Sequence, residues 1–314
     1  MTELTRKEFI KLTGAAGLTL ASGVAGGLAT PALADTFITK MVKKPIPSNG
    51  ELLPVVGFGT SQVFNVGNSE EERAPLLETL KILYDAGGSV IDTAPMYGPA
   101  EAVVGDLVAR LNSRNKSFIA TKVLQTGKQN GIDQMQSSFR KLKTSHVDLM
   151  QVHNLVDWQT QLGTLREMKQ DKKIRFLGIT HYTDSGTEEL IKIMKQEPLD
   201  FVQCQYAMNA RLVEEELLPL AQEKGIAILV NRPFGRGALF SKVKGRELPA
   251  WAEEYGIQSW AQYFLKYLLG HPAVTCVIPG TGRPDYARDN VMAGMSPLPE
   301  EKTRKMMLDH LESL

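Results

Sequence analysis

The chain has few cysteines and almost no net charge, and both shortages exclude classes of protein. Only two cysteines, Cys204 and Cys276, occur among its 314 residues, and each lies in an apolar run typical of a buried strand. We expect two small buried thiols and no disulfide framework. The formal net charge is +1, so no field exists to attract nucleic acid or an anionic membrane. The five histidines lack the spacing of metal ligands, and we expect no metal site.

The first 34 residues have the features of a removable export signal. A basic pair, Arg6-Lys7, precedes a weakly apolar stretch, Leu12–Ala29, and Ala32-Leu33-Ala34 forms an A-x-A cleavage site. The arrangement resembles the bacterial twin-arginine signal, although Lys7 stands in place of its second arginine. The alternatives are a membrane anchor, for which the stretch is too rich in glycine, and an amphipathic helix. We expect the export machinery to deliver a mature domain, residues 35–314, to the periplasm without stable membrane association; without a working signal it would stay cytoplasmic.

The remaining chain alternates between short apolar runs and amphipathic stretches. A hairpin pattern, Met41–Leu53, turns at Ser48-Asn49-Gly50, and a last helical pattern covers Pro299–Leu314. Eight apolar runs lie between them, each followed by a helical pattern: Val55–Phe58, Val90–Ile91, Phe118–Thr121, Val147–Val152, Ile174–Ile179, Phe201–Cys204, Ile226–Val230 and Val274–Ile278. This order predicts a single (β/α)₈ TIM barrel with an N-terminal hairpin and a C-terminal helix.

The alternative architecture is an open doubly wound sheet, and one missing glycine disfavours it. Such a sheet normally carries G-x-G-x-x-G after its first strand. The first predicted strand here continues as Gly57-Phe58-Gly59-Thr60-Ser61-Gln62, which lacks the third glycine. The barrel is therefore the better interpretation.

Four polar residues lie at or just beyond the predicted carboxyl ends of three adjacent strands, where barrel enzymes place their active sites. They are Asp92, Tyr97, Lys122 and His153. Each alone is more often a cap, a surface charge or a satisfied polar group, but their convergence on one mouth suits carbonyl reduction. Tyr97 would protonate the carbonyl oxygen, and His153 would orient that oxygen. Lys122 would lower the pKa of Tyr97 while Asp92 holds Lys122 in place.

Several segments resemble the aldo/keto reductases, in the same order along the chain. They are Val56–Thr60, Ile91–Gly98, Glu101 with Gly105, Thr121-Lys122, Val152–Asn154 and Ile278–Thr281. The resemblance implies the same barrel with a hairpin at its base and makes Asp92, Tyr97, Lys122 and His153 a catalytic tetrad. It also implies a small carbonyl substrate and a nicotinamide cofactor, usually NADPH, bound without a Gly-rich Rossmann turn.

Cofactor contacts follow from the resemblance by position. Asp92, Gly59 and Thr60 would lie near the nicotinamide, and Thr180, His181, Gln203 and Asn231 around its carboxamide and ring. The remaining contacts would hold the pyrophosphate and adenosine: Pro233, Gly235, Gly237, Gly280, Thr281, Arg283, Asp289 and Asn290. A helix start beside Arg283 also suits a phosphate on physical grounds.

Departures from the family pattern occur among the predicted cofactor contacts and not in the catalytic tetrad. Asn231 stands where an aromatic residue usually stacks on the nicotinamide, and His181 replaces an asparagine. Gly280 and Tyr286 replace a common lysine and arginine, so we expect NADP(H) to be preferred over NAD(H) by a modest margin. We therefore predict an NAD(P)H-dependent reductase of aldehydes or ketones. The alternative is a cofactor-binding barrel that serves as a sensor or accessory subunit with little turnover.

Overall fold

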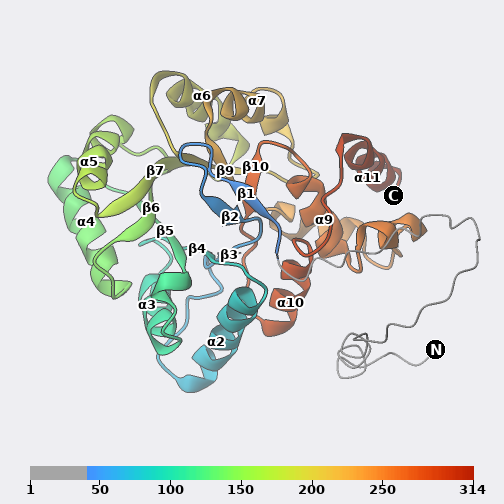
Figure 1. Cartoon of the computed structure of the whole chain (residues 1–314), viewed down its shortest axis with the longest axis horizontal. Coiled ribbons are helices and arrows are strands. Elements are labelled where there is room, and N and C mark those ends of the chain that lie inside the picture. The colour runs from blue at the N-terminus through green and yellow to red at the C-terminus, as the bar shows by residue number, and fades with distance from the viewer. Residues whose placement is uncertain (1–40) are drawn as a thin grey trace, which may run out of the picture. The chain divides into compact units, whose positions relative to one another are not determined.

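The computed structural model describes residues 41–314, so the export signal predicted for residues 1–34 lies outside the described residues. Eight strands form one parallel sheet in the order β10-β9-β8-β7-β6-β5-β4-β3. Single bridges, Val56 to Val277 and Gly59 to Gly280, join its two edges. The (β/α)₈ barrel predicted from the sequence is thus confirmed (Figure 1). The strands are β3 (Phe58–Gly59), β4 (Val90–Asp92), β5 (Phe118–Val123), β6 (Val147–His153), β7 (Ile174–Thr180), β8 (Phe201–Gln205), β9 (Ala227–Asn231) and β10 (Val274–Val277).

Helices surround the strands, as Figure 1 shows. Local signals fix several of their ends. Ser69 caps the first turn of α2 by accepting a hydrogen bond from the backbone N–H of Glu72, and Gly225 ends α7 in the left-handed conformation. The helices are α2 (Glu70–Asp85), α3 (Ala100–Arg110), α4 (Lys128–Lys141), α5 (Trp158–Gln170), α6 (Thr187–Gln196), α7 (Leu217–Lys224), α8 (Ala238–Lys242), α9 (Trp260–Leu269), α10 (Pro284–Met292) and α11 (Glu301–Ser313).

The predicted N-terminal hairpin closes the amino-terminal end of the barrel. Strands β1 (Lys43–Pro45) and β2 (Leu52–Pro54) pair antiparallel. Ile46 and Leu53 are fully buried and join the cluster of side chains inside the barrel. Phe118, Phe176 and Phe201 form the aromatic part of that cluster, with ring centroids 5.4–5.9 Å apart. This end of the barrel is therefore a packed apolar core.

Strand alternation gives the interior an apolar base and a polar mouth. Side chains two residues apart point to the same face of a strand. On β5 the inward series runs from Phe118 through Ala120 to Lys122, and on β8 it runs from Phe201 to Gln203. Buried polar side chains therefore collect where the carboxyl ends of neighbouring strands meet.

Three sequence predictions about the fold need correction or comment. The first strand was expected at Val55–Phe58, but β3 covers only Phe58–Gly59 because the preceding residues bond to the hairpin and to Val277. The loop after β9 contains α8 and a 3-10 helix, Ala250–Tyr255, which the sequence analysis missed. Both are too short to show a helical period. Cys204 and Cys276 are free and buried, as predicted.

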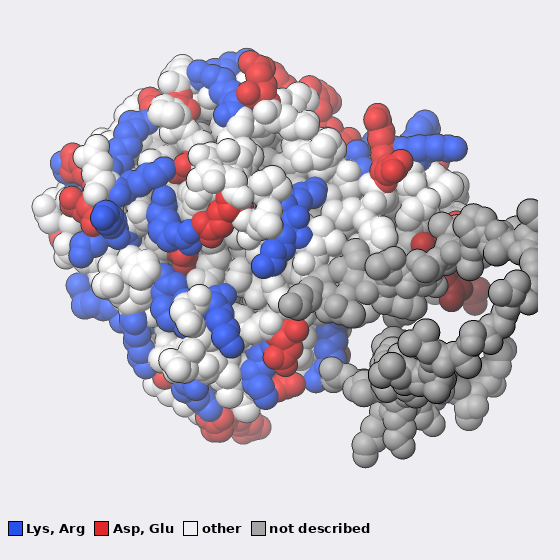
Figure 2. Space-filling model, viewed as in Figure 1, with Lys and Arg blue, Asp and Glu red and all other residues white. Residues whose placement is uncertain are grey.

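The surface matches the balanced composition. Basic and acidic side chains both occur across the face shown in Figure 2. No helix within residues 41–314 is long and apolar enough to cross a membrane.

Candidate active site

A buried ion pair lies at the mouth of the barrel. The Lys122 ammonium donates hydrogen bonds to Asp92 Oδ2 at 2.7 Å and to the Thr93 carbonyl at 2.8 Å. Burial alone would lower the pKa of Lys122, but the Asp92 carboxylate and the Tyr97 phenol outweigh it and leave that pKa raised. Lys122 therefore keeps its positive charge inside the protein.

Tyr97 lies in the loop that follows β4, with Lys122 Nζ 5.1 Å from its ring centroid. The sequence analysis expected Lys122 to lower the pKa of this phenol. Lys122 does lower the pKa of Tyr97, but burial raises it by more, so the net pKa lies above its ordinary value. The hydroxyl consequently keeps its proton at neutral pH.

His153 ends β6 and faces Tyr97 edge-on, with ring centroids 6.1 Å apart. Burial, helped by Lys122 and His181, lowers the pKa of His153 to about 3. Its imidazole is therefore neutral, so one ring nitrogen carries a hydrogen and can donate while the other can only accept. Buried Nδ1 has no hydrogen-bond partner within the described residues.

Two glutamines contact the Asp92 carboxylate of this ion pair. Gln203 Nε2 donates to Asp92 Oδ1 at 2.8 Å, and Gln151 Nε2 approaches the same oxygen at 3.4 Å. The sequence analysis assigned Gln203 to the cofactor carboxamide and gave Gln151 no role. The position of Gln151, two residues before His153 on the inward face of β6, was the available signal.

The residues predicted to hold the nicotinamide end lie around this network. Thr180 Oγ1 donates to Gln203 Oε1 at 3.1 Å, and Asn231 Nδ2 approaches the same oxygen at 3.4 Å. The Thr60 N–H donates to the Asp92 carbonyl. A Cβ at Gly59 would lie 2.9 Å from the Ile278 carbonyl, so close packing where the barrel closes already requires a glycine there. His181 turns its Nδ1 toward Thr183.

The residues predicted for the pyrophosphate and adenosine end form a second group. Asp289 accepts hydrogen bonds from Ser259, the N-cap of α9, and from Gln262 in its first turn. Asn290 donates to Thr281 Oγ1 at 3.0 Å, and both are buried. Arg283 is exposed and pairs with Asp285. The remaining members of the group adopt loop positions: Gly235 and Gly237 have positive φ, Pro233 is buried, and a Cβ at Gly280 would meet nothing within 4 Å.

Unsatisfied polar atoms at the mouth fit a polar ligand such as nicotinamide. Buried polar atoms in proteins nearly always have a partner. Five at the strand ends have none within the described residues: Thr60 Oγ1, Thr93 Oγ1, His153 Nδ1, Asn154 Oδ1 and Asn231 Oδ1. The residues present therefore suit the nicotinamide end of the predicted cofactor. No cluster of His, Cys, Asp and Glu suited to a metal occurs in residues 41–314.

An arginine outside the predicted set of site residues also lies at this mouth. Arg232 follows the last residue of β9, and its guanidinium stacks over the Tyr182 ring at 4.3 Å. Its NH1 approaches Gln205 Oε1 at 3.4 Å. The signal in the sequence was its position directly after a strand end.

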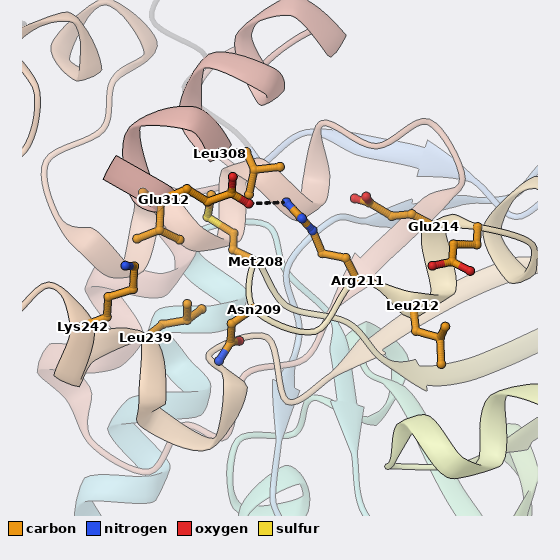
Figure 3. A pocket seen from close by; sticks show the side chains of 11 residues that line it. Met208, Asn209, Arg211, Leu212, Glu214, Leu239, Lys242, Leu308 and Glu312 are labelled. Atoms are coloured by element: carbon orange, nitrogen blue, oxygen red, sulfur yellow. Dashed lines mark ion pairs between the residues drawn. The ribbon is translucent and has the colours of Figure 1, made fainter. Parts of the chain in front are cut away.

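A separate pocket of about 820 Å³ lies elsewhere, between the segment after β8, α8 and α11. In Figure 3 Arg211 points toward Glu312, with which it forms an ion pair of 3.3 Å. None of the residues predicted for catalysis or cofactor binding lines this pocket.

A family model for the aldo/keto reductase family matches residues 55–307, which include every strand of the barrel. The chain belongs to the aldo/keto reductase family. The family and the fold inferred from the sequence are thereby confirmed.

Relatives of known name are distant but numerous. The aldo-keto reductase YhdN of Bacillus subtilis is 28% identical over 60% of this chain and 60% of its own. The methylglyoxal reductase YeaE of Escherichia coli is 26% identical over 76% of this chain and 84% of its own. A Klebsiella pneumoniae aldo-keto reductase solved with NADPH superposes with a TM-score of 0.72, at 24% identity over 86% of this chain and 95% of its own.

Proposed function

We propose that this chain is an NAD(P)H-dependent reductase of aldehydes or ketones, with Tyr97 as the proton donor. The observation that carries the proposal is the half-buried Tyr97 phenol, whose pKa is raised, beside a buried Lys122–Asp92 ion pair at the barrel mouth. Family membership supports the reaction class. A small carbonyl substrate agrees with the name of the Escherichia coli relative, a methylglyoxal reductase.

We infer that the cofactor is NADP(H), with NAD(H) as a weaker ligand. The Klebsiella pneumoniae structure with NADPH supports this choice. Thr60, His153 and Asn231 would face the nicotinamide, since each has a buried polar atom without a partner in the described residues. Arg283 would reach the phosphate end only by exchanging Asp285 for the phosphate.

Each side chain at the mouth has its own role in the proposed proton transfer. When bound, the reduced nicotinamide supplies a hydride to the carbonyl carbon. Tyr97 donates its hydroxyl proton to the carbonyl oxygen, which becomes an alcohol, and Tyr97 is left as a phenolate. Lys122 stabilises that phenolate with its fixed positive charge, and Asp92 holds Lys122. Neutral His153 donates a hydrogen bond that orients the carbonyl oxygen. A proton from solvent then restores Tyr97.

The purified chain tests this proposal directly. NADPH oxidation would be followed by absorbance with a panel of small aldehydes and ketones, and NADPH and NADH binding by calorimetry. We expect turnover, and tighter binding of NADPH than of NADH by a modest factor. Tight binding without turnover would instead favour the sensor or accessory role, which the replacement of the stacking aromatic residue by Asn231 would explain.

We also propose that residues 1–34 direct export by a twin-arginine route. The basic pair Arg6-Lys7 and the site at Ala32-Leu33-Ala34 support this proposal. Export after folding would suit a barrel that must bind its cofactor first.

A further inference from the structure

Arg232 has no acidic partner within residues 41–314. The ion pairs of this part of the chain occupy many of its surface arginines, but Arg232 is in none of them. Among the described residues, its guanidinium makes one polar contact, the long approach of NH1 to Gln205 Oε1 at 3.4 Å. Gln205 in turn donates to Asp184. A guanidinium carries five N–H donors, so most of its hydrogen-bonding capacity is unused.

Aromatic stacking fixes the position of this guanidinium. Arg232 lies over the Tyr182 ring at 4.3 Å, and the His181 ring is parallel to Tyr182, with centroids 5.6 Å apart and planes 4° apart. Stacking on an aromatic face restrains an arginine while leaving its N–H edge free for a planar anion. Tyr182 is 41% exposed, so it also offers apolar surface at the rim of the mouth.

The charge of Arg232 acts on the proton donor. It lowers the pKa of Tyr97, against the larger effect of burial. Because Lys122 is already neutralised by Asp92, Arg232 adds an uncompensated positive charge beside the reacting centre. Partial burial and the like charge of Arg236 disfavour the charged guanidinium and lower its own pKa. A negatively charged ligand bound to Arg232 would offset both the burial of its charge and the repulsion by Arg236.

We propose that Arg232 binds the carboxylate of the substrate, so that the preferred substrates are aldehydes or ketones that also carry a carboxylate. This inference rests on the proposed reductase function and names the substrate class of the same site. The free N–H edge suits a two-point contact with a carboxylate, and Tyr182 contacts the carbon skeleton between the two groups. A phosphate of the cofactor is the other anion that the loop after β9 could meet, and the experiment below distinguishes the two.

The test compares two substrates that differ in charge: para-carboxybenzaldehyde and its methyl ester. The variant is Arg232→Gln. Its matched control is Arg236→Gln, which removes the same charge from an exposed residue of the same loop, also at positive φ (58° against 51° for Arg232). We expect Arg232→Gln to lower kcat/KM for the acid by about tenfold or more and for the ester by less than about threefold. Arg236→Gln should change the acid-to-ester ratio by less than about threefold, and NADPH affinity should survive in Arg232→Gln.

Other outcomes overturn the inference or the function separately. Equal losses for acid and ester, with weaker NADPH binding, would assign Arg232 to a cofactor phosphate and overturn the inference while the reductase function stands. If the chain reduces neither aldehyde, the proposed function fails. Calorimetry with para-methylbenzoate and NADP⁺ then still decides the inference, because binding must occur and must be lost in Arg232→Gln. Arg232→Asn, which tolerates positive φ, serves as the second variant if Arg232→Gln does not fold.

Discussion

Burial raises the pKa of the Tyr97 hydroxyl, whereas the Lys122 ammonium lowers it, and the effect of burial is the larger. The phenol is therefore protonated at neutral pH. In the proposed mechanism, the ammonium matters most after the proton has left. Tyr97→Phe keeps the ring and removes the acid. We expect its reductase turnover to fall by about two to four orders of magnitude. Steady-state kinetics measures this loss, and NADPH binding serves as the control because it should change little. Near-normal turnover would exclude Tyr97 as the donor.

Lys122 should set the pH dependence of the reverse reaction. Alcohol oxidation needs the Tyr97 phenolate as a base, so its rate rises with pH through the pKa of Tyr97. Lys122→Met removes the cation that lowers this pKa, and the rise should move to higher pH while most activity is lost. A pH profile of alcohol oxidation at saturating cofactor checks the shift. An unmoved profile would make Lys122 purely structural.

The same substitution should also cost stability, because it leaves the Asp92 carboxylate buried without its partner. Loss of one member of a buried pair costs about 3–5 kcal/mol. We expect Lys122→Met to lower the free energy of unfolding by about that amount, and the double variant Asp92→Asn/Lys122→Met to recover most of it. Denaturant unfolding of both variants measures the difference. A double variant no more stable than the single one would contradict this account of the pair.

The sequence placed the four tetrad residues at one mouth because strand ends of a parallel barrel are readable from apolar runs. The sign of the shift at Tyr97 was not readable, since burial depends on neighbours distant in sequence. The same limit applied to Asp289, whose carboxylate accepts hydrogen bonds from Ser259 and Gln262 at the start of α9, and to Arg283, which pairs with Asp285. Which polar side chains pair with one another depends on the folded structure and could not be read from the sequence.

Among the elements, the N-terminal hairpin makes the clearest stability prediction. Ile46 is fully buried inside the base of the barrel, whereas Leu52 of the same hairpin is 59% exposed. We expect Ile46→Ala to lower the free energy of unfolding by about 2–5 kcal/mol. The matched control Leu52→Ala should change it by less than about 0.5 kcal/mol. Chemical denaturation distinguishes the two, and equal losses would show that the hairpin does not fill the barrel base.

Long periodic elements were the most predictable part of the fold. Four helices, α2, α3, α5 and α10, begin and end within a residue of the helical patterns in the sequence, which cover Glu70–Ala86, Ala100–Leu111, Trp158–Lys169 and Pro284–Met292. The sequence analysis missed α8, which has five residues and follows Gly235 and Gly237, both at positive φ. A helix so short is held by tertiary packing, such as that of buried Leu239, and leaves no period in the sequence.

At the scale of the whole chain, the N-terminal segment makes a prediction about processing. The cleavage pattern Ala32-Leu33-Ala34 predicts a mature protein that begins near Asp35 and is located outside the cytoplasm. Intact-mass spectrometry of the protein from fractionated cells of its source measures both. The control is Arg6→Ala/Lys7→Ala, which should leave the full-length chain in the cytoplasm. A soluble cytoplasmic protein that retains Met1 would contradict the prediction.

The packed base of the barrel also limits how protons travel. Phe118, Phe176, Phe201 and the hairpin residues Ile46 and Leu53 fill the interior below the polar layer. A close-packed apolar core of this kind leaves no room for a chain of water molecules among the described residues. In the proposed mechanism, every proton that Tyr97 gives up must then be replaced through the same opening that admits substrate and releases alcohol. Reprotonation of Tyr97 and release of the product would therefore use the same opening. A tightly bound product would delay reprotonation, and Tyr97 would remain a phenolate stabilised by Lys122 until the product leaves.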